Sequence, residues 1–133
     1  MSLEKSLKEI SGLLNKQTEA YKREVINKDE LSNLTLNHFN YIYAIEQLDN
    51  PTFSDLAETL DVTKASVSTM VNKLIKEGYV YKEQSSEDGR VYHLYLSGKG
   101  RGIVEAENKA FSDFINLIKE ELDRDEFEKL QLF

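Results

Sequence analysis

The residues of this chain whose types and spacing suit chemistry are hydrogen-bond donors and cations near its centre. Short hydroxyls let a helix approach the major groove of DNA, asparagine can pair with adenine through two hydrogen bonds, and lysine can reach phosphates. An ordinary solvated helix face has the same composition, so this segment alone leaves both readings open. The candidate contact residues here are Thr63, Lys64, Ser66, Ser68, Thr69, Asn72 and Lys73.

A second candidate group lies between two strand-like runs, residues 79–84 and 91–96, which are rich in Val, Tyr and Leu. The polar stretch between them favours a turn, so a hairpin is predicted. Arg90 lies at its tip, Asp88 is placed to orient the guanidinium, and Gly89 is expected to supply an unusual backbone angle. An arginine on a thin loop suits the narrow, electronegative minor groove. The alternative is an exposed ion pair worth roughly 0–1 kcal/mol.

The elements predicted before these groups are helices. Apolar residues recur at helical spacing through residues 3–26 and predict a long amphipathic helix that must bury its apolar stripe. The polar segment 27–33 is expected to be a loop. A second helix is predicted to begin after Thr35 as N-cap and to end at Asn50 and Pro51.

Two short helices are predicted next, joined by a tight turn. Thr52 and Asp55 have the spacing of a capping box, which opens the first of them. Residues 61–63 are too few for more than a turn, and the second helix is expected to end at Gly78. A helix-turn-helix followed at once by a hairpin is a winged-helix arrangement.

Two more helices are predicted at the C-terminal end, one from about Ser97 and a short one from Asp125. The fold class is therefore mainly α with a small β-hairpin (α+β), a winged helix-turn-helix flanked by N- and C-terminal helices. The length of 133 residues and the 40% of hydrophobic residues suit a single domain.

Composition narrows the function. Without cysteine the chain has no disulfide or thiolate metal site, and we find no nucleophile–base pair and no phosphate-binding glycine loop. His38 and His93 lack partners at ligand spacing, so no metal site is predicted and both are expected to be exposed or half-buried. We expect no enzyme and no cofactor. No apolar stretch is long enough to cross a bilayer, so a cytoplasmic protein without membrane contact is expected.

The net charge of −7 argues against nucleic acid until its distribution is considered. Residues 52–101 hold seven basic and seven acidic side chains, whereas residues 102–133 hold four basic and nine acidic ones. The acidic excess therefore lies mainly at the C-terminal end. A neutral centre can face DNA while that end points away.

Residues 52–101 resemble the winged helix-turn-helix of the MarR (multiple antibiotic resistance regulator) family. The wing pattern Asp-x-Arg followed by Leu-x-Leu-Thr-x-x-Gly is specific to it, with Ser97 in place of the threonine. Asp61 stands where many relatives have glycine, and aspartate tolerates a left-handed conformation. The residues that carry the resemblance are Leu56, Ala57, Val62, Thr63, Val67, Leu74, Gly78, Asp88, Arg90, Leu94, Leu96, Ser97 and Gly100.

The resemblance implies a homodimeric transcriptional regulator, most often a repressor, that binds a pseudo-palindromic operator in double-stranded DNA. Residues 1–34 and 102–133 would form the dimerisation helices of one MarR-like domain spanning residues 1–133, and residues 35–101 its DNA-binding part. Relatives commonly bind a small aromatic or lipophilic effector in a cleft between these parts. The residues near that cleft are Tyr21, His38, Tyr41 and Tyr43, although tyrosines at helical spacing are more often core.

One alternative from another class remains open. A winged helix that has lost DNA binding could serve as a protein–protein interaction module, for which Arg90 would be unimportant. The hydroxyl-rich helix and Arg90 together favour DNA binding.

Overall fold

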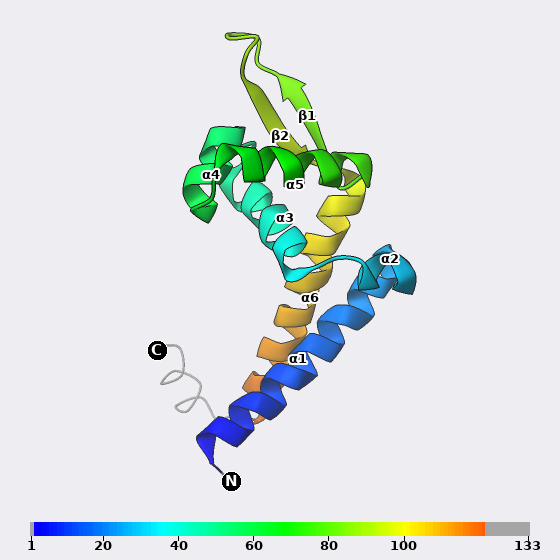
Figure 1. Cartoon of the computed structure of the whole chain (residues 1–133). Helices are drawn as coiled ribbons and strands as arrows, with labels where there is room; N and C mark the ends of the chain where they lie inside the picture. Colours follow the sequence, from blue (N-terminus) through cyan, green and yellow to red (C-terminus); the bar gives the residue numbers. More distant parts are fainter. Residues whose placement is uncertain (1, 122–133) are drawn as a thin grey trace.

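The structure is a computed structural model that describes residues 2–121. It confirms the mainly helical fold class with one antiparallel hairpin, arranged as a winged helix-turn-helix (Figure 1). The short helix predicted from Asp125 lies outside the described residues. The elements are α1 (Leu3–Val25), α2 (Lys28–Ser32), α3 (Leu36–Leu48), α4 (Phe53–Leu60), α5 (Lys64–Lys76), β1 (Val80–Gln84), β2 (Tyr92–Leu96) and α6 (Gly98–Glu121).

The two long helices, α1 and α6, pack against each other and form an arm that extends away from the rest of the molecule (Figure 1). The wing lies at the opposite end from this arm, and α5 crosses the molecule below the wing. None of the helices within residues 2–121 combines the length and the apolar character needed to cross a membrane.

The hydrophobic core lies where α3, α4, α5, the hairpin and the first turns of α6 meet. Seven of its fully buried side chains lie in helices or strands, at positions that the helical or strand periodicity turns inward. These residues are Ile42, Leu56, Val67, Val71, Leu74, Leu94 and Ile103. The core therefore holds α5 and the wing on one rigid support.

Side-chain caps fix where the central helices begin. Thr35, Thr52 and Thr63 each accept a hydrogen bond from the amide three residues later, and Thr52 forms the predicted capping box with Asp55. The turn between α4 and α5 places Asp61 at φ 53°, which confirms the left-handed conformation expected there. This turn sets the angle between α4 and α5.

The loop predicted over residues 27–33 is wrong, because α2 forms there. The Asn27 side chain accepts a hydrogen bond from the Glu30 amide at 2.8 Å and caps the helix. Asp29 and Glu30 stand in its first turn, where the helix dipole favours acidic groups, and Leu31 is buried. A helix of one turn is too short to show apolar periodicity, so only its cap marks it in the sequence.

The hairpin is attached to the chain that enters α4. Val80 pairs with Leu96 and Gln84 with Tyr92 in the antiparallel register. The Leu94 amide donates to the Pro51 carbonyl at 2.8 Å, outside the two strands. The wing is thus hydrogen-bonded to the chain that leads into α4, and β2 continues through Ser97 into α6.

Candidate nucleic-acid interface

The outer face of α5 is open to solvent, as an element that enters a groove requires. Val67, Val71 and Leu74 anchor the inner face in the core. Among the predicted contact residues, Ser68 is half-buried and the others are exposed: Thr63, Lys64, Ser66, Thr69, Asn72 and Lys73. The structure therefore brings all seven onto or beside one helix face.

Some of these side chains already make hydrogen bonds within the protein, and others do not. The Thr63 hydroxyl accepts from the Ser66 amide at 3.1 Å and donates to Ser66 Oγ at 2.9 Å, so it is occupied by capping. The Thr69 hydroxyl donates to the Ala65 carbonyl at 3.0 Å. Ser68 and Asn72 have no side-chain hydrogen bond to any residue within 2–121. Their polar groups are therefore without a partner in this part of the chain.

The charge of this helix differs from that of the whole chain. Between residues 62 and 76 there are three lysines and no acidic residue. Lys64, Lys73 and Lys76 are exposed, and none of them forms an ion pair within the described part of the chain. A locally cationic surface can bind phosphates in a protein whose net charge is −7.

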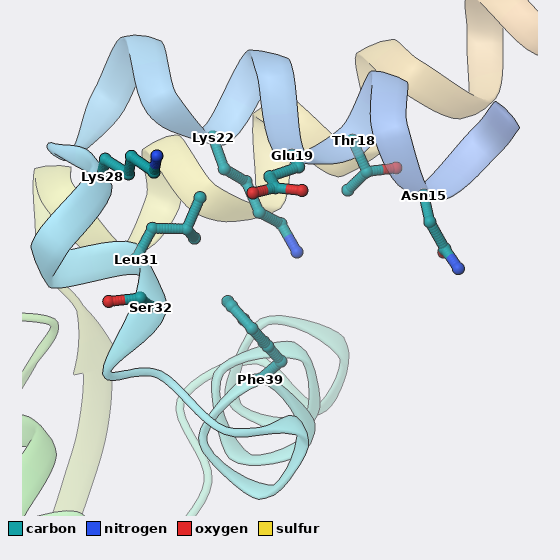
Figure 2. Close-up of a pocket in the computed structure, with 8 residues that line it drawn as sticks. All are labelled: Asn15, Thr18, Glu19, Lys22, Lys28, Leu31, Ser32 and Phe39. Atoms are coloured by element: carbon teal, nitrogen blue, oxygen red, sulfur yellow. The ribbon is translucent and has the colours of Figure 1, made fainter. Parts of the chain in front are cut away.

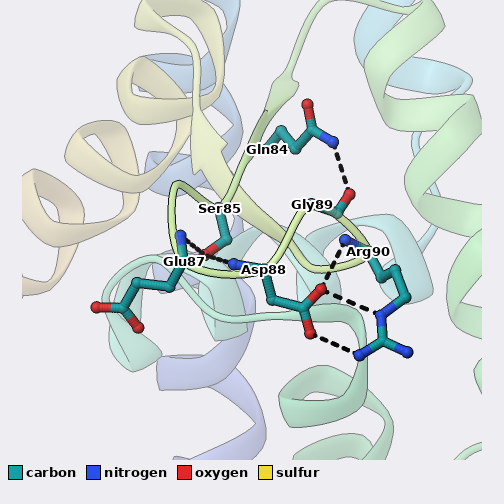
Figure 3. A network of polar contacts seen from close by, with 6 residues as sticks. All are labelled: Gln84, Ser85, Glu87, Asp88, Gly89 and Arg90. Carbon is teal, nitrogen blue, oxygen red and sulfur yellow. Dashed lines mark hydrogen bonds and ion pairs between the residues drawn. The ribbon is translucent and has the colours of Figure 1, made fainter.

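The tip of the wing is held by its own hydrogen bonds (Figure 3). The Ser85 amide donates to the Val91 carbonyl at 2.8 Å, and the Gln84 side chain donates to the Gly89 carbonyl at 2.6 Å. The amide of Glu87 donates to the Ser85 hydroxyl at 3.2 Å. These bonds give the loop a defined shape before any partner binds.

Arg90 projects from this tip with 91% of its side chain exposed. Its Nε donates to Asp88 Oδ1 at 3.1 Å and its Nη2 to Oδ2 at 3.2 Å, which confirms that Asp88 orients the guanidinium. These bonds, with a further one from the Arg90 amide, hold the pKa of Asp88 below its usual value. The pair stays charged and keeps the arginine extended into solvent.

The backbone angle expected of Gly89 is wrong. Among the glycines within residues 2–121, only Gly78 has a positive φ, of 87°. A Cβ at Gly89 would lie 3.0 Å from the side-chain nitrogen of Gln84, which is the end of an exposed, flexible side chain and can move aside. The turn obtains its shape from Asp88, whose carboxylate accepts from the Arg90 amide at 3.0 Å.

The four predicted effector residues do not line one cavity. The Tyr21 hydroxyl donates to Asp113 between α1 and α6. Tyr41 is buried beside α5, and the His38 ring caps α3 by accepting from the Thr35 amide at 2.9 Å. The Tyr43 hydroxyl is buried, and this burial, with the neighbouring Glu107 carboxylate as a smaller cause, raises its pKa.

A cavity of about 300 Å³ opens instead between α1, α2 and α3, and we call it the Lys22 pocket. Figure 2 shows Lys22, Leu31 and Phe39 reaching into it from the three helices. The pocket is lined by Asn15, Thr18, Glu19, Lys22, Lys28, Leu31, Ser32 and Phe39. The sequence pattern did not predict this pocket, although Leu14, Thr18 and Lys22 follow at four-residue spacing and mark a second inward stripe of α1.

Lys22 is the unusual member of this pocket. Only 7% of it is exposed, and burial lowers the pKa of its ammonium group against a smaller opposing effect of Glu107. Its Nζ lies 3.9 Å from the centre of the Phe39 ring and 5.6 Å from that of Tyr43. Aromatic faces, and no carboxylate at ion-pair distance within residues 2–121, therefore hold this cation.

His38 departs from the expectation of an exposed or half-buried side chain, whereas His93 agrees with it. His38 is fully buried, because its ring completes the α3 cap, and so it is neither exposed nor half-buried. His93 is half-buried and its Nδ1 lies 2.9 Å from the Asn50 carbonyl. Within residues 2–121 no group of three His, Cys, Asp or Glu side chains could hold a metal ion.

Helix α5, the hairpin and the core that holds them together define a winged helix-turn-helix. Comparisons with known proteins point to the same architecture. Residues 34–92 match the model of the MarR family. The HTH-type transcriptional regulator BilQ of Clostridioides difficile is 28% identical over 97 residues, which are 73% of this chain and 66% of BilQ. The chain thus spans just under two thirds of that relative. The central part of the chain, which holds the winged helix, is therefore similar to the MarR family.

Solved structures share the fold over almost the whole chain. The structure of Streptococcus pneumoniae FabT in complex with DNA has a TM-score of 0.69 at 21% identity and covers 98% of this chain and 90% of FabT. The structure of S. aureus MepR bound to ethidium bromide has a TM-score of 0.71 at 21% identity. The match covers 99% of this chain and 91% of MepR. At these identities the likeness shows the fold.

Proposed function

We propose that this protein is a sequence-specific regulator of transcription, most simply a repressor, that binds double-stranded DNA. Two neighbouring features support this proposal. Helix α5, which we call the recognition helix, carries lysines and no acidic residue, and Arg90 extends into solvent from the wing beside it. The helix suits the major groove and the arginine the adjacent minor groove. The proposed contacts are those on α5 and the wing: Thr63, Lys64, Ser66, Ser68, Thr69, Asn72, Lys73, Asp88 and Arg90.

The proposal includes a homodimer built through the arm. Large apolar side chains of α1 and α6 face solvent, and a single chain rarely leaves so many uncovered. Leu3 is 75% exposed and Leu13 60%, while Leu117 on α6 is 51% exposed. A second copy that covers this surface would place two reading heads on successive half-sites of a pseudo-palindromic operator. Residues 1–34 and 102–133 then form the dimerisation part of one domain, and residues 35–101 the DNA-binding part.

The decisive experiment selects bound fragments from random duplex DNA and measures their affinity at several salt concentrations. We expect a palindromic site, affinity that falls steeply with salt, and a loss of roughly tenfold to a hundredfold in Arg90→Ala. Equal affinity of Arg90→Ala for the selected duplex would remove the wing from the interface. A protein that selects no duplex at low salt would favour the protein–protein interaction module.

A small-molecule effector is the second part of the proposal, and the Lys22 pocket is its site. The pocket combines a buried cation with aromatic and aliphatic walls, which suits an aromatic or lipophilic ligand that carries an acid group. Tyr43 borders it through its contact with Lys22, whereas Tyr21, His38 and Tyr41 lie outside. Thermal shift assays with phenolic and fatty acids test this, and Lys22→Met should abolish any stabilisation.

The other aspects of function follow from DNA binding. BilQ is described as a transcriptional regulator and not as an enzyme, and we propose no catalytic activity here. A regulator that binds duplex DNA works in the compartment that holds the DNA, so the cytoplasm is the proposed location.

A further inference from the structure

Three parts of the chain meet at the carboxylate of Glu30: α2 itself, the segment between α5 and β1, and the start of α6. Glu30 Oε1 accepts a hydrogen bond from the Tyr79 hydroxyl at 2.7 Å and forms an ion pair with Lys99 of α6. Lys99 in turn donates to the Glu77 carbonyl at 3.2 Å, and its Nζ lies 4.5 Å from the centre of the Tyr79 ring. We call Glu30, Tyr79 and Lys99 the α2 clasp.

The far side of the clasp is the C-terminal end of the recognition helix. The Tyr79 amide donates to the Leu74 carbonyl at 2.9 Å, and the Tyr79 carbonyl accepts from the Ser97 amide at 3.0 Å. Tyr79 is fully buried, so its ring cannot move without these neighbours. Any displacement of the Tyr79 hydroxyl therefore acts directly on the last turn of α5.

The near side of the clasp is the Lys22 pocket. Lys28, Leu31 and Ser32 of α2 line the pocket, while Glu30 of the same helix holds Tyr79 and Lys99. The helix has only five residues, from Lys28 to Ser32, and cannot absorb a displacement along its length. A change on the pocket side is thus passed to the Glu30 carboxylate.

The hydrogen bonds of the clasp support its charged state. The pair with Lys99 and the bond from Tyr79 lower the pKa of Glu30, so the carboxylate is ionised at neutral pH. Burial, with the bond to Glu30, raises the pKa of Tyr79, so its hydroxyl keeps the proton that it donates. A charged acceptor with two donors is directional and resists reorientation.

We propose that Glu30 is a positioning residue that couples the Lys22 pocket to the C-terminal end of the recognition helix through Tyr79 and Lys99. This inference deepens the proposed function and relies on it for its biological meaning. Its physical content, the coupling of α2 to α5, holds for the protein without DNA or ligand.

The test is a double-mutant cycle read by hydrogen exchange on the full-length protein. Ser32→Leu adds bulk on the pocket side of α2, and the readout is exchange at the amides of Glu77, Gly78 and Tyr79, which are hydrogen-bonded at the end of α5. We expect Ser32→Leu to change this exchange at least roughly threefold, and less than about half as much once Glu30→Gln is also present.

A matched control is available on the same helix. Asp29→Asn removes an equal charge from the first turn of α2 and touches neither Tyr79 nor Lys99, so it should leave the effect of Ser32→Leu intact. Tyr79→Phe removes only one hydrogen bond of the clasp and should reduce the coupling without unfolding α2. If Glu30 had only a structural role, Glu30→Gln would destabilise the protein, and the effects of Ser32→Leu and Glu30→Gln on amide exchange would be additive.

Two results would overturn the inference. One is a Ser32→Leu effect of the same size in the presence and absence of Glu30→Gln, and the other is no effect of Ser32→Leu at residues 77–79. Failure of the proposed function is separate, because exchange is measured without DNA. If the protein binds no duplex but the effects of Ser32→Leu and Glu30→Gln are non-additive, the coupling through the α2 clasp is supported and the proposed regulation of transcription is refuted.

Discussion

The Asp88 carboxylate holds Arg90 by three hydrogen bonds, from Nε, Nη2 and the backbone amide, and leaves Nη1 without a partner in the described chain. One edge of the guanidinium is fixed and its other corner points outward (Figure 3). In the proposed interface the acid would therefore have two opposing effects on DNA binding. Its charge would repel phosphates, and its hydrogen bonds would orient the cation that binds DNA.

Replacing Asp88 decides which effect is larger. Charge alone predicts that Asp88→Asn binds operator more tightly, whereas loss of orientation predicts weaker binding. We expect affinity to fall by roughly threefold to tenfold, because an arginine that must be ordered on binding loses side-chain entropy. Glu87→Gln on the same loop removes an equal charge without touching Arg90, and should bind as tightly as the parent or slightly more so. Equal gains in both variants, measured by fluorescence anisotropy, would refute the orienting role.

The lysines of α5 should appear in the salt dependence. Lys73→Gln removes an exposed cation from the recognition helix and should reduce the slope of log affinity against log salt by about one unit, with similar losses for all duplexes. Lys16→Gln on the arm is the control and should leave the slope unchanged. A slope that is insensitive to Lys73 would place this residue outside the interface.

Neighbouring glycines at the start of α6 should respond in opposite ways to alanine. A Cβ on Gly100 would overlap the Tyr79 carbonyl oxygen far inside van der Waals contact, and that oxygen cannot yield because Ser97 holds it. Gly98 has open space around it, so Gly98→Ala should stabilise the protein by a few tenths of a kcal/mol up to about 1 kcal/mol. Gly100→Ala should lower the unfolding free energy by at least about 1–3 kcal/mol. Urea unfolding of the two variants checks both signs.

Acid should remove the contribution of Glu30. Its pKa is lower in the folded protein than the ordinary value of 4.5, chiefly because of Lys99. The clasp therefore stabilises the fold fully above pH 4.5 and loses this contribution as the pH falls through the lower, folded pKa. The difference in unfolding free energy between the parent and Glu30→Gln should shrink over that window. A difference that stays constant down to pH 2.5 would contradict a charged clasp.

The exposed apolar face of the arm should carry dimerisation. Leu7 is 56% exposed on α1, and Leu7→Glu should shift the sedimentation coefficient from dimer to monomer at micromolar concentration. Lys5→Gln changes the charge by the same amount on the opposite side of the helix and should remain dimeric. Identical sedimentation of both variants would locate the interface elsewhere.

Local signals in the sequence predicted most of the fold. Thr35, Thr52 and Thr63 mark helix starts because a threonine hydroxyl satisfies an amide within three residues. The wing and its Asp88–Arg90 pair are also local, which is why both were predictable. The Lys22 pocket was not, because it joins side chains from α1, α2 and α3 that only packing brings together. The positions of Tyr21 and Tyr41 away from that pocket depend on helix rotation, which spacing alone does not define.

The hydrogen bonds at the base of the wing limit how this protein can adapt to a binding site. The Asn50 carbonyl meets His93 and the Pro51 carbonyl meets Leu94, so the hairpin is tied to the chain that leads into α4. Wing and recognition helix then move as one block. In the proposed dimer, an operator whose half-sites are set further apart would be accommodated by bending in the arm or in the DNA, because the span from helix to wing is constant.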